Sequence, residues 1–174
     1  MPHVRSMTRA AIALSLASLA GCASWPGADH SRDFVIVRHA EKVPDGSDDP
    51  ELTAAGRARA QAIADTLADT DVVAVYSTDT RRTRQTATPT AQAHGLPIIP
   101  YAGEEPAQAL ATRLLDAHSS GTVLVVGHSN TVPALAQALC GCAIDPIAES
   151  EYGRRITVRA LPSGRVRVDD RREP

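Results

Sequence analysis

Aromatic residues are scarce in this chain of 174 residues, where Phe, Tyr and Trp together make up only 3 %. A hydrophobic core must therefore be built mainly from closely packed Ala, Val, Leu and Ile. Lysine is rarer still, since Lys42 is the single lysine among 18 basic residues. The formal net charge of −2 gives no case for binding to nucleic acid or for a polybasic membrane-binding surface. Internal repeats and low-complexity blocks are also lacking, which favours one domain.

The amino-terminal apolar run is too short to span a membrane. It covers residues 10–20, well below the roughly 20 residues that a spanning helix needs. Because Arg5 and Arg9 precede it and small residues follow it, the order is typical of an export signal. Leu19-Ala20-Gly21-Cys22 resembles the lipobox of bacterial lipoproteins, in which the cysteine is diacylated and becomes the new amino terminus. The alternative is a plain secretory signal whose cysteine is incidental.

These features divide the chain into three predicted segments. We expect a signal peptide over residues 1–21, a lipidated Cys22 with a short flexible tether to residue 32, and a folded domain over residues 33–174. Ala23 follows the cysteine, and by the sorting rule of Gram-negative envelopes a residue other than Asp there implies the outer membrane, facing the periplasm. The expected location is therefore the cell envelope, with a lipid anchor in the membrane.

Two further cysteines, Cys140 and Cys142, stand one residue apart. In an oxidising compartment they can form a strained local bridge or stay free. Their spacing is too tight for an ordinary disulfide loop, and their surroundings offer too few partners for zinc. The sequence leaves both states of the pair open.

The most informative stretch is an apolar run that ends in an arginine and a histidine. Residues 34–37 are consecutive apolar residues, mostly β-branched, which is typical of a strand buried on both faces. Arg38 and His39 would then lie at the carboxyl end of that strand, the edge where open α/β sheets bind ligands. Arg38 can hold a phosphate through its planar guanidinium, and His39 can attack it. The alternative is an ordinary loop histidine after a core strand.

Two later strands also end in polar residues. The run Val72–Tyr76 leads into the start of a helix that carries Arg81, Arg82 and Arg84, where backbone N–H groups favour an anion. Positions 81 and 84 share one side of such a helix and position 82 points elsewhere, so one arginine can reach a pocket while the others contact solvent. A third buried run, Thr122 to Val126, ends in Gly127 and His128. We expect these strand ends to lie together.

The remaining pattern predicts a three-layer α/β/α fold whose sheet is mostly parallel with an antiparallel edge strand. Besides the three buried strands and the helices after Arg81 and His128, it predicts helices over 53–68 and 107–118, a short edge strand over 96–100 and a hairpin over 156–168. Pro89 is expected to kink or end the helix that contains it, and residues 169–174 are expected to be loose. A nucleotide-binding Rossmann protein is disfavoured because no Gly-rich turn follows the first strand.

Together these residues resemble the histidine phosphatase superfamily, also called the phosphoglycerate mutase-like group. The resemblance covers about residues 33–140. Its markers, in order, are Val37-Arg38-His39-Ala40-Glu41, Leu52-Thr53-x-x-Gly56, Ser77 through Arg82 to Gln85-Thr86-Ala87, and Val126-Gly127-His128-Ser129. Each is weak alone, and their order and spacing are family-like. The chain departs from the family's usual Ser-Pro-Leu turn, since Thr78-Asp79-Thr80 follows Ser77.

The resemblance implies a role for each marker residue. His39 is the nucleophile that is transiently phosphorylated, Arg38 and Arg82 hold the phosphoryl oxygens, and His128 stabilises the transferring group. No metal and no cofactor is implied, because cationic side chains can neutralise the equatorial oxygens. The implied activity is hydrolysis of phosphate monoesters or of phosphohistidine, with a phosphorylated small molecule or a phosphoprotein as partner.

The proton donor for the leaving group is less clearly marked. Many family members have a Glu after the third strand, and Glu104 and Glu105 occupy that region without the surrounding family pattern. Asp45 and Asp48 are alternatives. Mutase activity is disfavoured because the chain has no insertion to shield a bisphosphorylated intermediate. The competing class is a non-catalytic envelope protein that binds a phosphorylated sugar or lipid.

Overall fold

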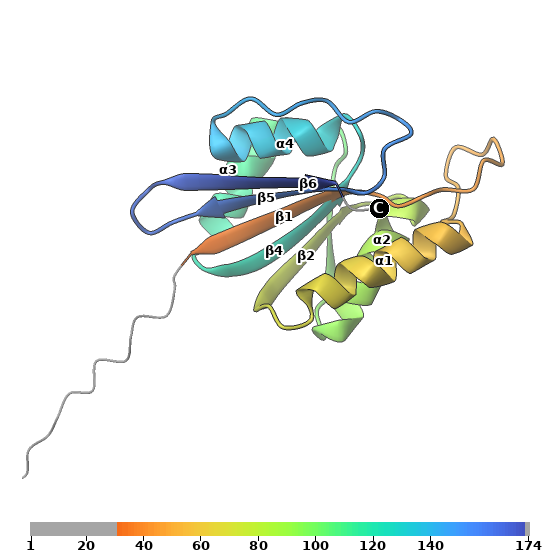
Figure 1. Ribbon diagram of the computed structural model, residues 1–174, viewed down its shortest axis with the longest axis horizontal. Coiled ribbons are helices and arrows are strands. Elements are labelled where there is room, and N and C mark those ends of the chain that lie inside the picture. Colours follow the sequence, from red (N-terminus) through yellow and green to blue (C-terminus); the bar gives the residue numbers. More distant parts are fainter. Residues whose placement is uncertain (1–30, 173–174) are drawn as a thin grey trace, which may run out of the picture.

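The computed structural model describes residues 31–172. Its strands are β1 (Arg32–Arg38), β2 (Val72–Thr78), β3 (Ile98–Tyr101), β4 (Gly121–Gly127), β5 (Arg154–Ala160) and β6 (Val166–Arg172). Its helices are α1 (Ala54–Leu67), α2 (Arg81–Ala93), α3 (Ala107–Ala117) and α4 (Thr131–Cys140). The strands form one sheet in the order β3-β2-β4-β1-β5-β6, and Figure 1 shows helices on both of its faces.

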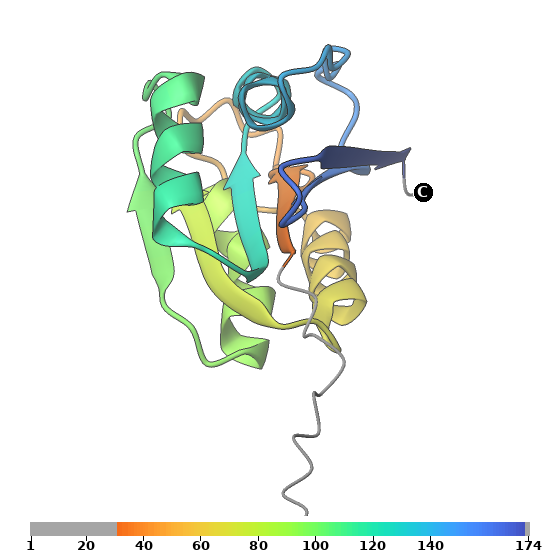
Figure 2. The same cartoon turned by 90° about the vertical axis from the view of Figure 1, so that its left-hand side faces the viewer.

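The predicted architecture is confirmed. Strands β1 to β4 run parallel, and the β5–β6 hairpin adds two antiparallel strands at one edge. Helices α1 and α2 pack on one face of the sheet and α3 and α4 on the other, giving three layers (Figures 1 and 2). The central strands β1 and β4 are buried on both faces, so their sequences are apolar without alternation. Because of this topology, the polar residues at the ends of β1, β2 and β4 share one edge.

The pairing of β1 with β4 places the two histidines. In this parallel register Arg38 lies opposite Gly127, so His39 and His128 leave the sheet side by side. The backbone N–H of His39 donates to the Gly127 carbonyl at 2.9 Å, which extends the pairing by one residue. The sheet itself therefore fixes the distance between the two rings.

Helix α1 begins against the segment that follows His39. The Thr53 hydroxyl accepts the N–H of Gly56 at 3.0 Å, which caps the helix. The N–H of Thr53 donates to the Glu41 carbonyl at 2.9 Å. A Cβ atom at position 56 would lie 2.2 Å from that same carbonyl oxygen, so only glycine allows this close approach. Thr53 and Gly56 thus hold the chain just beyond His39 in place.

Two elements extend further than expected. Helix α2 continues through Pro89 to Ala93, so of the two effects expected for this proline, a kink or an end, the end is wrong. Residues on both sides of the proline pack into the core. Strand β6 runs to Arg172, so the stretch from Asp169 that was expected to be loose is paired with β5. The reason is the buried Arg154, whose guanidinium binds the Asp170 carboxylate at 2.6 Å.

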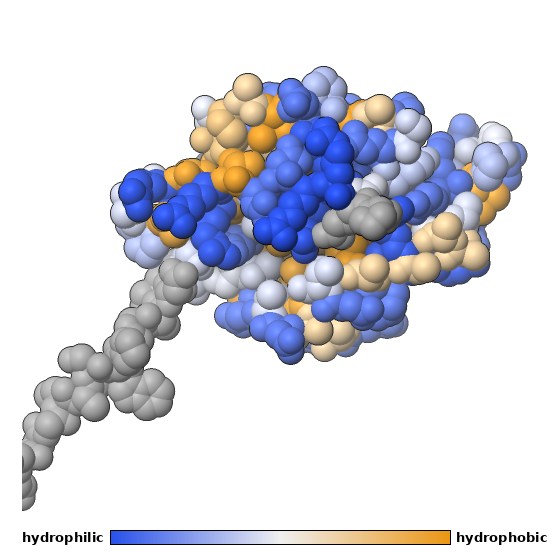
Figure 3. Space-filling model, viewed as in Figure 1, coloured by the Kyte–Doolittle hydropathy of each residue, from blue (hydrophilic) through white to orange (hydrophobic). Residues whose placement is uncertain are grey.

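The outer surface of the hairpin is polar. Strand β6 is exposed along its whole length, and Figure 3 shows hydrophilic side chains over the middle of the face seen in Figure 1. Cys140 and Cys142 form a disulfide at the end of α4, which resolves the pair that the sequence left open. None of the helices within residues 31–172 is long and apolar enough to cross a bilayer. The predicted signal peptide, Cys22 and tether fall almost entirely in residues 1–30, outside the described part of the chain.

Candidate active site

Two imidazole rings face each other at the carboxyl edge of the sheet. The ring centroids of His39 and His128 are 5.5 Å apart, and the rings meet edge to face. His39 is only 3 % exposed, whereas His128 is half-buried. A phosphate group placed at this edge can contact both rings.

His39 is held in one tautomer. Its Nδ1 lies 2.8 Å from the Ala40 carbonyl oxygen, and because a carbonyl only accepts, this nitrogen carries the hydrogen. The Ala40 N–H in turn donates to the Thr86 hydroxyl at 3.0 Å. The free lone pair of the ring is therefore on Nε2. This is the arrangement that a nucleophilic imidazole needs.

Burial keeps both imidazoles neutral. It lowers the pKa of His39 to about 4, the Ala40 hydrogen bond opposes this shift, and the charges of Arg38 and Arg82 add to it. The pKa of His128 is also lowered to about 4, by burial first and then by Arg82 and Arg38, with Glu149 opposing. At neutral pH His39 is thus unprotonated and able to attack an electrophile.

Arg38 is buried and held mainly by the segment before β5. Its Nη1 donates to the carbonyls of Ala148, Glu149 and Glu151 at 3.0, 2.8 and 3.1 Å. Its Nη2 donates to the Glu149 carboxylate at 2.8 Å, and its Cζ lies 4.4 Å from the centroid of the Tyr152 ring. The buried Nε–H finds no hydrogen-bond partner among residues 31–172. One donor of this guanidinium is therefore left for a ligand.

The three arginines at the start of α2 lie in different environments. The side chains of Arg81 and Arg84 are 56 % and 54 % exposed, and each pairs with a surface carboxylate. The side chain of Arg82 is only 16 % exposed, and its buried Nε has no partner within the described chain. Its closest carboxylate oxygen, on Asp49, is 3.6 Å away. Arg82 is thus the least exposed of the three arginines, and its charge lowers the pKa of both His39 and His128.

A threonine that the sequence did not single out supports His128. The hydroxyl of Thr78, at the end of β2, lies 3.0 Å from Nε2 of His128. The N–H of His128 donates to the Thr131 hydroxyl at 2.9 Å at the start of α4. Thr78 is the first residue of the stretch that stands where the family's usual turn would be, so this stretch contacts a ring of the candidate site.

Three of the candidate proton donors make other contacts or are exposed. Glu105 binds Arg113 of α3 at 2.7 Å and lines a cavity of about 190 Å³ between the starts of α3 and α4. Glu104 is exposed. Asp45 is fully exposed and binds Ser47 within its own loop, at 2.8 Å. The described contacts therefore tie none of these three carboxylates to the two histidines.

Sequence reasoning missed a carboxylate that does lie at the site. One oxygen of Glu149 accepts from Arg38, and the other accepts from the Ser129 hydroxyl. Tyr152 was also missed, although its ring centroid is 6.0 Å from that of His39. Both residues belong to an irregular connection between α4 and β5 without an apolar period. No local pattern could have pointed to them, because only the folded chain brings this connection to the end of β1.

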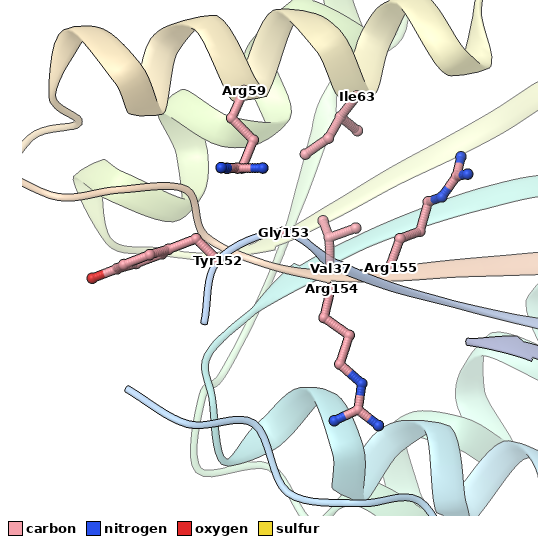
Figure 4. A pocket seen from close by; sticks show the side chains of 7 residues that line it. All are labelled: Val37, Arg59, Ile63, Tyr152, Gly153, Arg154 and Arg155. Carbon is pink, nitrogen blue, oxygen red and sulfur yellow. The ribbon is translucent and has the colours of Figure 1, made fainter. Parts of the chain in front are cut away.

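A second buried arginine anchors the same connection. Arg154 donates to the carbonyls of Asp145 and Pro146 at 2.8 and 3.0 Å. Figure 4 shows it on the α4 side of the sheet, opposite Arg59 of α1, beside a small cavity. This cavity measures about 10 Å³, which is enough for a water molecule and too small for a substrate. Arg38 and Arg154 therefore fix the residues around Glu149 from both ends.

Comparison with known proteins finds a family match over part of the chain. Residues 34–103 match the model of the histidine phosphatase superfamily (branch 1). No curated protein sequence matches the chain.

Solved structures share the fold. The protein histidine phosphatase SixA, complexed with tungstate, is 20 % identical with a TM-score of 0.66, over 80 % of this chain and 96 % of that chain. A mycobacterial glucosyl-3-phosphoglycerate phosphatase is 17 % identical with a TM-score of 0.65, over 83 % of this chain and 100 % of its own. The structure named mycobacterial hydrolase 1 is 17 % identical with a TM-score of 0.63, over 80 % and 97 %. At such identities the likeness concerns the fold.

Proposed function

We propose that the chain is a member of the histidine phosphatase superfamily (branch 1), whose model matches residues 34–103, and that it is a phosphatase with a phosphohistidine intermediate on His39. Its substrates are phosphate monoesters or phosphohistidine. Distant structural relatives include a protein histidine phosphatase and a glucosyl-3-phosphoglycerate phosphatase. These two names span both substrate classes.

One observation carries the proposal. His39 and His128 lie 5.5 Å apart, between ring centroids, next to two buried guanidinium Nε–H groups that find no partner among residues 31–172. Buried donors are normally paired, because an unmet one costs about 1–3 kcal/mol. A phosphate dianion would satisfy both donors. Arg38 and Arg82 would then neutralise the charge that the equatorial oxygens carry in the transition state.

The chemistry follows from the tautomer of His39. Its Nε2 lone pair attacks phosphorus, the bond from phosphorus to the leaving oxygen breaks, and the phosphoryl group stays on the ring. Water then attacks phosphorus and the P–N bond breaks, releasing phosphate and restoring the imidazole. His128 contacts the phosphoryl oxygens in both steps, and the Thr78 hydroxyl holds its ring in place.

The first test uses purified residues 23–174 and p-nitrophenyl phosphate. We expect turnover that His39→Ala abolishes, while His94→Ala at the end of α2 leaves it unchanged. Rapid quenching with labelled substrate should trap an adduct on His39 that is labile in acid and stable in base. Binding of a phosphorylated sugar or lipid without any turnover would support the non-catalytic alternative instead.

We also propose that the protein is a lipoprotein of the cell envelope, anchored through Cys22 and facing the periplasm. The support is the lipobox-like Leu19-Ala20-Gly21-Cys22 together with the disulfide between Cys140 and Cys142. Disulfides persist mainly in oxidising compartments such as the bacterial periplasm. A phosphatase placed there acts on phosphorylated molecules of the envelope.

A further inference from the structure

The missing proton donor has a candidate in the connection between α4 and β5. The Glu149 carboxylate bridges two groups of the site: Oε2 accepts from Nη2 of Arg38 at 2.8 Å, and Oε1 accepts from the Ser129 hydroxyl. Its side chain is 79 % exposed, although Arg38 beside it is only 2 % exposed. The carboxylate therefore lies on the solvent side of the guanidinium that is expected to hold the phosphate.

This position is fixed by the backbone. Nη1 of Arg38 donates to the carbonyls of Ala148, Glu149 and Glu151 and so holds this part of the backbone. Arg154 holds the carbonyls of Asp145 and Pro146 in the same way. Glu149 thus stands on a segment held by two buried guanidiniums, rather than on a free loop. A carboxylate held in this way can take part in chemistry that requires a defined position.

Phosphoryl transfer requires the attacking and leaving atoms to be roughly in line through phosphorus. His39 is buried beneath the site, so the leaving oxygen must lie on the opposite, solvent-facing side. That is the side on which Glu149 lies. We propose that Glu149 is the residue that protonates the leaving group and then accepts a proton from the attacking water. The inference rests on the proposed phosphatase function.

The two half-reactions balance. In the first, a new bond forms between Nε2 of His39 and phosphorus, the P–O bond breaks, and the leaving oxygen takes the proton of the Glu149 carboxyl. In the second, water attacks phosphorus, the P–N bond breaks, and the proton lost by water returns to the Glu149 carboxylate. Glu149 takes up one proton from the solvent when the substrate binds and gives it back when phosphate leaves, so the enzyme is restored without any further reactant.

Substrate binding should change the pKa of Glu149 in the direction that a proton donor needs. In the ligand-free protein the pKa of Glu149 is lowered, first by the Ser129 hydrogen bond and also by the charge of Arg38. A bound phosphate dianion competes for Arg38 and adds negative charge beside the carboxylate. Both effects raise the pKa of a carboxyl group. The substrate itself therefore converts Glu149 from an ion-pair partner into an acid.

The test compares leaving groups. Purified residues 23–174 carrying Glu149→Gln are assayed with p-nitrophenyl phosphate, whose nitrophenolate leaves without a proton, and with an alkyl phosphate such as glycerol phosphate, whose alkoxide needs one. We expect kcat/KM for the alkyl ester to fall by about 10²- to 10⁴-fold, while kcat/KM for the nitrophenyl ester changes little. With p-nitrophenyl phosphate, Glu149→Gln should show a burst of nitrophenolate followed by slow turnover, because no carboxylate then takes the proton from the attacking water in the second half-reaction. Glu104→Gln and Glu105→Gln serve as controls and should behave like the unaltered protein.

Three results would overturn the assignment. An equal loss for both esters would mean that Glu149 only positions Arg38. A gain for both would mean that it only competes with phosphate. A selective loss for the alkyl ester in Glu104→Gln or Glu105→Gln, with Glu149→Gln normal, would place the acid after β3. By contrast, absence of turnover and of a His39 adduct in the unaltered protein would refute the phosphatase function itself.

Discussion

At the scale of single residues, the guanidiniums of Arg38 and Arg82 differ in the partners that they bind. Most N–H groups of Arg38 donate to protein carbonyls and to Glu149. Arg38 therefore links the edge of the sheet that carries His39 to the connection before β5. Within residues 31–172, Arg82 makes only long contacts, at 3.4 Å to the Asp48 carbonyl and 3.6 Å to the Asp49 carboxylate. Its guanidinium is therefore the more available one for an anion. A lysine could not replace Arg38, because one ammonium cannot span these planar contacts.

The first prediction separates Arg82 from its neighbours. Arg82→Ala should lower kcat/KM for p-nitrophenyl phosphate by about 10²- to 10³-fold, because a donor to the charged transition state is lost. Arg84→Ala is the matched control, since this exposed side chain pairs with Asp79 at the surface and should change kcat/KM by less than about 2-fold. Steady-state kinetics on the folded variants checks both. Comparable losses in the two variants would contradict the assignment.

The second prediction concerns pH. The unfolded chain protonates His39 and His128 near their ordinary pKa of 6.5, whereas the folded chain does so near 4. Between these values the unfolded state binds more protons, so the free energy of unfolding should fall as the pH drops from 6.5 to 4. In His39→Asn, which cannot titrate but keeps a donor for the Ala40 carbonyl, the fall should be smaller. Urea unfolding at several pH values measures it, and equal slopes would count against a buried neutral His39.

Without the family resemblance, the residues of the candidate site could be predicted from the sequence only where they follow the end of a buried strand. Arg38, His39 and His128 follow buried apolar runs, and the topology of a parallel sheet brings such ends together. Arg82 needed the family resemblance in addition, because helical spacing alone does not choose among three nearby arginines. Glu149 follows no regular element. Its place depends on long-range hydrogen bonds, to a guanidinium 111 residues earlier in the chain, which local patterns do not encode.

At the scale of elements, the start of α1 helps the strands to position the segment that follows His39. The Thr53 cap and the bare Cα of Gly56 let this helix approach the Glu41 carbonyl. The apolar runs predicted the three central strands because burial on both faces leaves a continuous signal. Strand β6 was partly missed, since a fully exposed strand has no such signal and is held by its pairing with β5. Helix α2 likewise passes Pro89 because tertiary packing outweighs local propensity.

The third prediction uses this close approach. Replacing a helical glycine by alanine usually stabilises a protein by about 0.5–1 kcal/mol, but Gly56→Ala should destabilise this one by about 1–3 kcal/mol. The reason is that its Cβ would lie 2.2 Å from a backbone oxygen that cannot move freely. Gly103→Ala is the control, because its Cβ would meet only a methyl group at 3.6 Å. Thermal or urea unfolding compares them, and a Gly56→Ala protein as stable as the parent would refute the argument.

At the scale of the whole molecule, the site and the first described residue lie at opposite ends of β1. Arg32 begins this strand and Arg38 ends it, so His39 and His128 lie at the opposite end of β1 from residue 31. Figure 1 shows the course of this strand. An anchored protein arranged in this way keeps its catalytic edge open to molecules in the surrounding compartment. The proposed membrane anchor and the proposed active site are therefore geometrically compatible.

The fourth prediction tests that anchor. In cells given labelled palmitate, the full chain should incorporate the label and fractionate with membranes, because acyl chains on Cys22 add about 0.8 kcal/mol of membrane affinity per buried CH₂. Cys22→Ala should lose the label and keep its leader uncleaved, which a gel detects as a larger chain. The double variant Cys140→Ser, Cys142→Ser is the control and should keep the label, since these cysteines are joined to each other at the end of α4. A full chain that is cleaved, unlabelled and released in soluble form would instead show a plain secretory signal, and the phosphatase proposal would stand without the anchor.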